Sequence, residues 1–274
     1  MNTLPPEKAA VETTVDHDGV RIRVRRIGTG RPVVLVHGLM ASGEVWFRQE
    51  RPLAQDHDVI IPDLRGHGRS GKPTDGHTVE DHAADLDAVL EALNVERADV
   101  VGWSMGAVVA MHYAATRPAK VGRLALLSAT PMMVTQEDFE HAVPFDGLRP
   151  MLRGLITDFP GTARGFAELL TAPEDDASVV DLLYSLALET TGITAAAAIL
   201  GVGCGDLRGA IARIDRPTLV LHGELDQIVP SAAGRWVSEQ IPGSRFEVFA
   251  GASHAFLLTR PDEVTARLRE FLSQ

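Results

Sequence analysis

Apolar residues along this chain occur in two kinds of run, alternating and continuous, which predict two kinds of strand. Residues 20–27 alternate between apolar and polar positions, a pattern typical of a hairpin strand with one face in water. Continuous apolar runs instead predict parallel strands that are covered on both faces. Such runs lie at residues 32–38, 58–63, 98–104 and 122–129, and two more strands are predicted at 216–223 and 244–250.

Helical periodicity occupies the segments between these strands. Residues 78–93 carry one apolar stripe, and Thr78 followed by Asp81 resembles a capping box at the start of that helix. Further helices are predicted at 105–117 and 261–272. Because strands and helices alternate in this way, we expect an α/β fold whose mostly parallel sheet is doubly wound and right-handed. The apolar stripe consists of Val79, Ala83, Leu86, Leu90 and Leu93.

The alternation stops after Pro131. Residues 132–208 contain helical stretches separated by prolines but no clear strand. We interpret them as a helical lid inserted into a core made of residues 14–131 and 209–274. Residues 1–13 are expected to be a loosely attached tail.

Composition and charge limit the cellular environment and the binding partners that we expect. The chain has 274 residues, of which 45% are hydrophobic, and a net charge of −11, which argues against a nucleic-acid partner. Cys204 is the only cysteine and has no partner for an internal disulfide, so we expect it to be structural. The N-terminus lacks a signal-peptide pattern, and the apolar runs are too short to span a bilayer. We therefore expect a cytoplasmic protein that contacts no membrane, and its oligomeric state stays open.

The strongest chemical signal is Gly102-Trp103-Ser104-Met105-Gly106, which fits G-x-S-x-G between a buried strand and a helix. A sharp turn at this point requires small residues on either side of the serine. It would hold the Ser104 hydroxyl at the carboxyl end of the sheet, next to the free N–H groups of the helix. The setting predicts that Ser104 is a nucleophile.

A serine hydroxyl needs a base, and the base needs a third group that orients it. With this type of turn, the three residues follow the order serine, acid, histidine along the chain. Asp226 and His254 supply that order, each directly after a predicted strand. Glu224 lies two residues before Asp226 and is the alternative acid.

Acyl transfer also needs N–H donors for the negative charge that develops on the substrate oxygen. We expect these donors to be the backbone N–H groups of Met105, directly after the serine, and of Leu39, in the loop after the strand at 32–38. No grouping of His, Cys and Asp has convincing metal-ligand spacing, so neither a metal nor another cofactor is expected.

Together, these segments resemble the α/β-hydrolase superfamily from about residue 20 to the end of the chain. Within it, the chain is similar to small bacterial carboxylesterases, to cofactor-free haloperoxidases and to esterases of acyl-carrier methyl esters. The resemblance implies eight mostly parallel strands and favours Asp226 over Glu224. Ala107 departs from many relatives, which have glycine there. The matching segments are 37–38, 63–73, 102–106, 222–230 and 251–256.

The resemblance implies cleavage of a carboxylic ester, or a related acyl bond, of a small and largely apolar substrate. Perhydrolysis, hydrolysis of a C–C bond and ligand binding without catalysis are the alternatives. The lid region holds twelve Asp and Glu against four Arg, a net charge of −8, which disfavours strongly anionic substrates. The candidate pocket residues are Trp46, Trp103, Met132 and Phe139.

Overall fold

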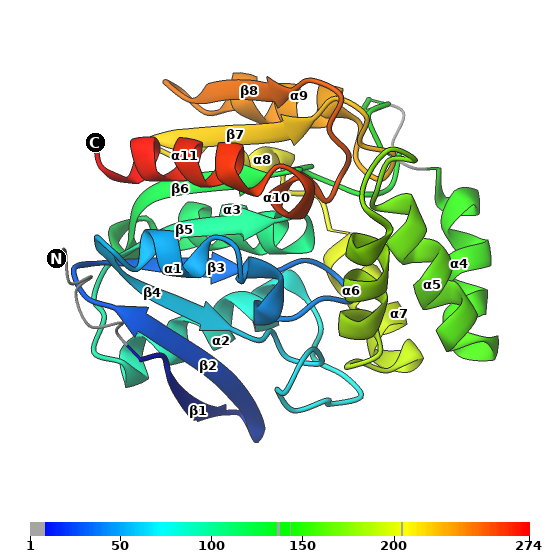
Figure 1. Cartoon of the computed structure of the whole chain (residues 1–274), viewed down its shortest axis with the longest axis horizontal. Coiled ribbons are helices and arrows are strands. Elements are labelled where there is room, and N and C mark those ends of the chain that lie inside the picture. Colours follow the sequence, from blue (N-terminus) through cyan, green and yellow to red (C-terminus); the bar gives the residue numbers. More distant parts are fainter. Residues whose placement is uncertain (1–8, 136–137, 143, 204) are drawn as a thin grey trace, which may run out of the picture.

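One eight-stranded sheet forms the centre of the computed structural model, which describes residues 9–135, 138–142, 144–203 and 205–274 (Figure 1). The strands lie in the order β1-β2-β4-β3-β5-β6-β7-β8. The β1–β2 and β2–β4 pairs are antiparallel and all other pairs are parallel, as expected. The strands are β1 (Val11–His17), β2 (Val20–Gly28), β3 (Arg31–Val36), β4 (His57–Pro62), β5 (Ala98–Trp103), β6 (Val121–Leu127), β7 (Thr218–Gly223) and β8 (Arg245–Phe249).

The continuous apolar runs are explained by two separate cores, one on each face of the sheet. Successive side chains of a strand point to opposite faces. In β3, Val34 and Val36 belong to one buried cluster, whereas Val33 and Leu35 belong to the other. Most residues of a central strand therefore face a core on either side of the sheet, and in β3 only Arg31, at its start, is exposed.

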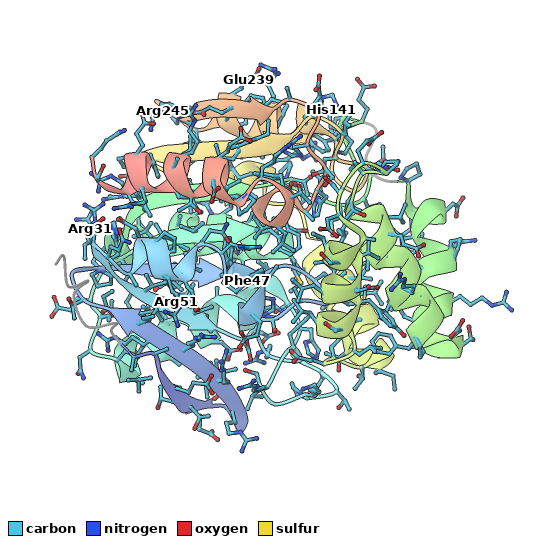
Figure 2. The ribbon with its side chains drawn as sticks, viewed as in Figure 1. Arg31, Phe47, Arg51, His141, Glu239 and Arg245 are labelled. Carbon is cyan, nitrogen blue, oxygen red and sulfur yellow. The ribbon has the colours of Figure 1, made fainter. Side chains whose placement is uncertain are left out.

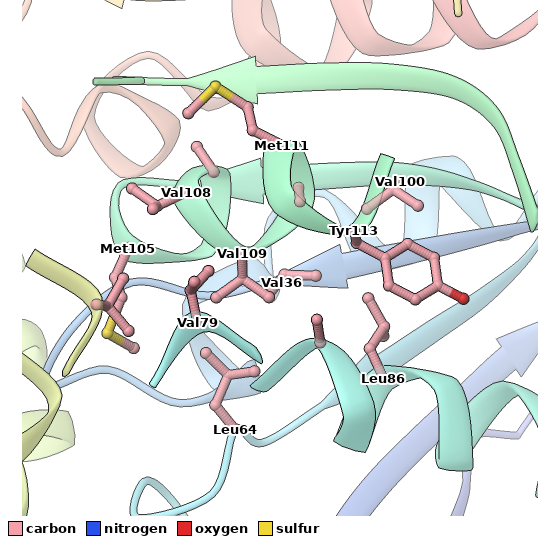
Figure 3. Close-up of a cluster of buried hydrophobic side chains, with 14 of the residues drawn as sticks. Val36, Leu64, Val79, Leu86, Val100, Met105, Val108, Val109, Met111 and Tyr113 are labelled. Carbon is pink, nitrogen blue, oxygen red and sulfur yellow. The ribbon is translucent and has the colours of Figure 1, made fainter. Parts of the chain in front are cut away.

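Helices cover both faces. The buried cluster that includes Val34 also takes in side chains of α2, α3, α8 and α9, and the other cluster takes in side chains of α1, α10 and α11. Figure 3 shows Val109 and Tyr113 of α3 beside Val79 and Leu86 of α2. These helices are α1 (Glu50–Leu53), α2 (Val79–Ala92), α3 (Met105–Thr116), α8 (Arg208–Ile211), α9 (Ser231–Gln240), α10 (Phe256–Thr259) and α11 (Pro261–Leu272).

The capping box expected at the start of α2 is confirmed. The Thr78 hydroxyl oxygen accepts a hydrogen bond from the Asp81 N–H, and the Asp81 carboxylate accepts one from the Thr78 N–H at 2.9 Å. Both bonds satisfy N–H groups that have no partner within the helix.

A helical insertion lies between β6 and β7. Figure 1 shows its helices beyond the carboxyl ends of the parallel strands, whereas Arg31, at the start of β3, lies at the opposite edge (Figure 2). The Leu207 N–H donates to the Pro131 carbonyl at 3.0 Å, so the chain enters and leaves the insertion at neighbouring points. The Thr190 hydroxyl also ties the insertion to the core through the Gly66 carbonyl at 2.5 Å. The long helices of the insertion are α4 (Phe145–Thr157), α5 (Phe159–Leu169), α6 (Ala177–Ala187) and α7 (Gly192–Gly203).

The expectation of a loose tail up to residue 13 is wrong for its last part. The strand β1 begins at Val11 and pairs with β2 along its whole length, so the ordered core starts before residue 14. Asp18 and Gly19 join the two strands with φ values of 50° and 73°. An Asp-Gly pair favours this kind of two-residue hairpin turn, and it was the overlooked signal. Residues 1–8 and Cys204 lie outside the described residues.

Within the described ranges, no single helix combines the length and the apolar character needed to cross a membrane. Only α6 and α7 taken together meet that test, and they are bent by 94° relative to each other.

Candidate active site

Ser104 lies at a strained turn between β5 and α3, with φ of 55° and ψ of −120°. A left-handed backbone of this kind costs a non-glycine residue on the order of 1–3 kcal/mol. The turn needs glycine on both sides. A Cβ on Gly102 would lie 2.3 Å from the Gly106 carbonyl oxygen, and a Cβ on Gly106 would lie 2.2 Å from the Val36 carbonyl oxygen. The predicted strand–turn–helix setting of the motif is therefore confirmed.

The structure brings the other two predicted residues together. Nδ1 of His254 lies 2.7 Å from Oδ2 of Asp226, and neither side chain has any solvent exposure. The second carboxylate oxygen, Oδ1, accepts the Ile228 and Val229 N–H groups at 2.9 and 2.8 Å. Since every one of these contacts favours a carboxylate, Asp226 presents a fixed negative charge to Nδ1 of the imidazole.

Two further side chains contact Asp226. The Ser128 hydroxyl donates to Oδ2 at 2.7 Å, and Nε2 of His222 lies 3.3 Å from the same oxygen. Burial raises the pKa of Asp226, but the facing His254 and the hydrogen bonds from His222 and His254 outweigh it and hold this pKa well below its ordinary value. Neither Ser128 nor His222 was identified from the sequence as a partner of Asp226.

Glu224, the alternative acid, has a different task in the structure. Its Oε2 accepts the Gly251 N–H at 2.8 Å, and the Leu225 N–H donates to the Ala252 carbonyl at 2.8 Å. These bonds join the loop that carries Asp226 to the loop that carries His254. Glu224 thus stabilises the contact between these two loops, while Asp226 contacts the imidazole of His254.

Trp103 links His254 to the serine turn. The Trp103 indole N–H donates to the His254 carbonyl at 3.1 Å, and the two rings lie 5.4 Å apart between centroids. Ser104 is the next residue along the chain. Nε2 of His254 is buried and has no hydrogen-bond partner among the described residues, so it is available to accept the proton of a hydroxyl.

The loop after β3 lies against the serine turn. A Cβ on Gly38 would come within 3.1 Å of the Ser104 Cβ. His37 fixes this loop, because its Nε2 accepts the Leu64 N–H at 2.9 Å and its Nδ1 therefore donates to the Gly38 carbonyl at 2.8 Å. Burial lowers the pKa of His37 to about 4, so the ring is neutral at pH 7.

The two predicted backbone donors, Leu39 and Met105, both lie next to these features. Within the part of the chain that the structure describes, neither N–H donates a hydrogen bond to another residue. Both residues are buried, with relative exposures of 8% and 5%. Unpaired N–H groups in a buried position are what an oxyanion requires.

The candidate pocket residues fall into two groups. Trp46 and Trp103 are 0% and 1% exposed and belong to the same apolar core cluster, which gives them a packing role. Met132 and Phe139 lie in a smaller cluster together with Val229. Whether any of these residues lines a substrate pocket stays a prediction. A cavity of about 10 Å³ touches Met132 and is otherwise lined by Thr130, Met133, His141, Ala142, Ile228, Val229 and Pro230.

No three His, Cys, Asp or Glu side chains among the described residues are grouped so as to hold a metal ion.

Comparisons with known proteins agree with this fold. The family model described as "alpha/beta hydrolase fold" matches residues 31–188. A pimeloyl-[acyl-carrier protein] methyl ester esterase from Chromobacterium violaceum is 34% identical, and the match covers 91% of this chain and 97% of that protein. The non-heme chloroperoxidase CPO-A1 of Kitasatospora aureofaciens is 30% identical, with 94% and 98% covered.

A similar solved structure is the esterase EaEST of Exiguobacterium antarcticum. It has a TM-score of 0.92 and 26% identity, and the match covers 96% of this chain and 100% of that one. Fold, motif setting and sequence similarity all agree, and we conclude that this chain belongs to the α/β-hydrolase fold family.

Proposed function

We propose that this protein is a serine hydrolase that cleaves a carboxylic ester of a small, largely apolar substrate through an acyl-enzyme. The observation that carries the proposal is the buried hydrogen bond between Asp226 and His254. The other ring nitrogen of His254 is unpartnered among the described residues, and the ring packs against Trp103, the residue before Ser104. The similarity to named esterases supports the same reaction.

In the proposed reaction, Oγ of Ser104 attacks the ester carbonyl carbon while Nε2 of His254 accepts the hydroxyl proton. Asp226 stabilises the imidazolium that results. The N–H groups of Leu39 and Met105 bind the negative oxygen of the tetrahedral intermediate. His254 then gives the proton to the leaving alcohol, and a water molecule activated by the same base releases the acid.

The charge of the lid supports a small, uncharged substrate. Residues 132–208 carry twelve acidic side chains and four arginines, which leaves a net charge of −8. Of these arginines, Arg149, Arg164 and Arg208 already form ion pairs within the chain. A strongly acidic carrier protein would meet repulsion at this surface. We therefore propose a free ester, although the C. violaceum relative is named for a carrier-bound one.

The direct test is covalent labelling by a fluorophosphonate, followed by mass spectrometry of the labelled peptide. Label on Ser104 in the native protein, and none in Ser104→Ala, is the expected result. Hydrolysis of p-nitrophenyl esters of increasing acyl length should then show an early burst of p-nitrophenol. Folded protein that takes no label at Ser104 would contradict the proposal.

Perhydrolysis is the second candidate, because a relative with 30% identity is a non-heme chloroperoxidase. It would use the same acyl-enzyme, with hydrogen peroxide instead of water attacking the acyl group. Bromide oxidation that requires both a carboxylic acid and peroxide, and disappears in Ser104→Ala, would establish this activity. Ester hydrolysis without any such oxidation would leave the esterase alone.

A further inference from the structure

The segment that joins α5 to α6 in the lid is hydrogen-bonded to the residues on either side of His254. The Ser253 hydroxyl donates to Oδ2 of Asp175 at 2.8 Å. The Ala255 N–H donates to the Leu170 carbonyl at 2.8 Å. Residues 170–175, which we name the lid stem, thus contact both chain neighbours of the proposed base.

The lid stem is itself held in a defined shape. The Ala172 N–H donates to Oδ2 of Asp175 at 2.8 Å, and the Asp175 N–H donates to the Ala172 carbonyl at 3.0 Å. Oδ2 of Asp175 is therefore oriented by its own turn before it accepts the Ser253 hydroxyl. Ser253, His254 and Ala255 are at most 1% exposed, so the Ser253 hydroxyl and the Ala255 N–H donate from buried positions, whereas Asp175 is partly exposed.

Other elements hold His254 at different atoms. Asp226 contacts its Nδ1, and the Trp103 indole contacts its carbonyl. The Trp103 bond holds the main chain at His254 itself, and the Leu225 N–H holds it two residues earlier, at the Ala252 carbonyl. The lid stem adds the bonds at Ser253 and Ala255, directly on either side of His254. An imidazole attached to a shifted main chain would move away from the serine even with Asp226 in place.

We propose that Asp175 is a positioning residue: through Ser253 it holds His254 in position for catalysis, and so couples the base to the lid stem. The proposal rests on the proposed function of His254 as the base. Reaction rates depend steeply on such placement, and a displacement of about 1 Å can cost about 100-fold. Asp175 touches no reacting atom, so it should affect the chemical step more than substrate binding.

Variants at the hydrogen bond provide the test, with p-nitrophenyl ester hydrolysis and the rate of fluorophosphonate labelling of Ser104 as the two measurements. For Asp175→Ala and Ser253→Ala we expect kcat and the labelling rate to fall by about 10-fold or more, with KM changed by about 2-fold at most. The double variant should be no slower than the slower single variant, because both substitutions remove the same bond.

A conservative variant separates positioning from negative charge. Both bonds to Asp175 end on the same oxygen, so the single carbonyl oxygen of Asn can accept both. Asp175→Asn should therefore keep kcat within about 3-fold of the native value. Thr190→Val is the matched control, because it removes another hydroxyl-to-core bond of the lid, at Gly66, away from His254. It should lower Tm without lowering kcat.

The outcomes are distinct. If Asp175→Ala and Ser253→Ala lose Tm but keep kcat, as Thr190→Val is expected to do, the contact is only structural and the proposal is wrong. Should Asp175→Ala not fold, Ser253→Ala, which removes one hydroxyl, decides alone. Native protein that folds but is not labelled at Ser104 contradicts the proposed function itself, whereas normal labelling in both the native protein and Ser253→Ala contradicts only the role of the lid stem.

Discussion

The hydroxyl of Ser128 and Nδ1 of His254 bind the same oxygen of Asp226, each at 2.7 Å. Ser128 directly follows β6, whereas Asp226 follows β7, the neighbouring strand. The Ser128 hydroxyl thus holds Oδ2 of Asp226 from the end of the neighbouring strand. The Ile228 and Val229 N–H groups hold the other oxygen, Oδ1. Asp226 therefore has little freedom to rotate away from the imidazole.

Replacing Ser128 by Ala should leave one lone pair of a buried carboxylate unsatisfied. We expect kcat/KM for ester hydrolysis to fall by about 10-fold and the free energy of unfolding to fall by about 1–3 kcal/mol. Steady-state kinetics and urea denaturation measure the two effects. Native stability and native kcat/KM together would show that this bond contributes nothing.

The identity of the acid can be tested by a matched pair of amides. Asp226→Asn should lower kcat by about 10⁴-fold, because the amide favours the wrong tautomer of His254. Glu224→Gln keeps an acceptor for the Gly251 N–H and should change kcat by no more than about 3-fold. Equal losses in the two variants would overturn the assignment of separate tasks to these carboxyl groups.

Gly106→Ala should prevent folding or destabilise the protein by several kcal/mol, since its Cβ would lie 2.2 Å from a main-chain oxygen of β3. Gly165→Ala is the control within a helix. A Cβ there meets no atom within 4 Å, and the substitution should stabilise α5 by about 0.5–1 kcal/mol. Thermal denaturation of both variants checks the contrast.

Stability should decrease on acidification because buried histidines resist protonation. Burial lowers the pKa of His37 to about 4, and burial together with the neighbouring His37 lowers that of His67 to about 3. As pH falls from about 6.5 toward these values, the unfolded chain binds protons that the folded protein does not. Each ring then lowers the free energy of unfolding by up to about 1.4 kcal/mol for each pH unit of acidification.

Two variants should change this slope in opposite directions. His67→Gln removes one such ring and should flatten the loss between pH 6.5 and 4.5. Asp99 acts the other way, because burial, only partly offset by Arg31, raises its pKa to about 6. Between the ordinary pKa of an aspartate and about pH 6, the folded protein binds a proton at Asp99 that the unfolded chain does not, so Asp99 raises stability as the pH falls. Asp99→Asn removes this contribution and should steepen the loss of stability. Urea midpoints at several pH values provide the measurement, and identical slopes in all three proteins would contradict both assignments.

The sequence predicted those features that depend on local pattern. Continuous apolar runs located most of the parallel strands, because a strand that is buried on both faces is mainly apolar. The Ser104 motif was recognisable because the sharp turn restricts the residue types beside the serine, and the resemblance to the α/β-hydrolase superfamily implied the order of Asp226 and His254.

Other features depend on contacts between residues far apart in the chain. Nothing around Ser128 in the sequence marks it as a partner of Asp226, 98 residues later. Glu224 resembled a second acid until the structure placed Gly251 beside it. Whether Trp46 and Trp103 line a pocket stays a prediction, because large apolar side chains suit both pockets and cores.

The bond between Pro131 and Leu207 closes the insertion into a loop whose two ends meet, so the sheet would keep its strand pairing if the helices between them were exchanged. Substrate preference could then diverge during evolution, or be grafted in the laboratory, as one cassette. A foreign cassette would still have to supply an acceptor for Ser253. Grafts chosen only for the shape of their pocket would fold, yet work slowly, until that one oxygen was restored.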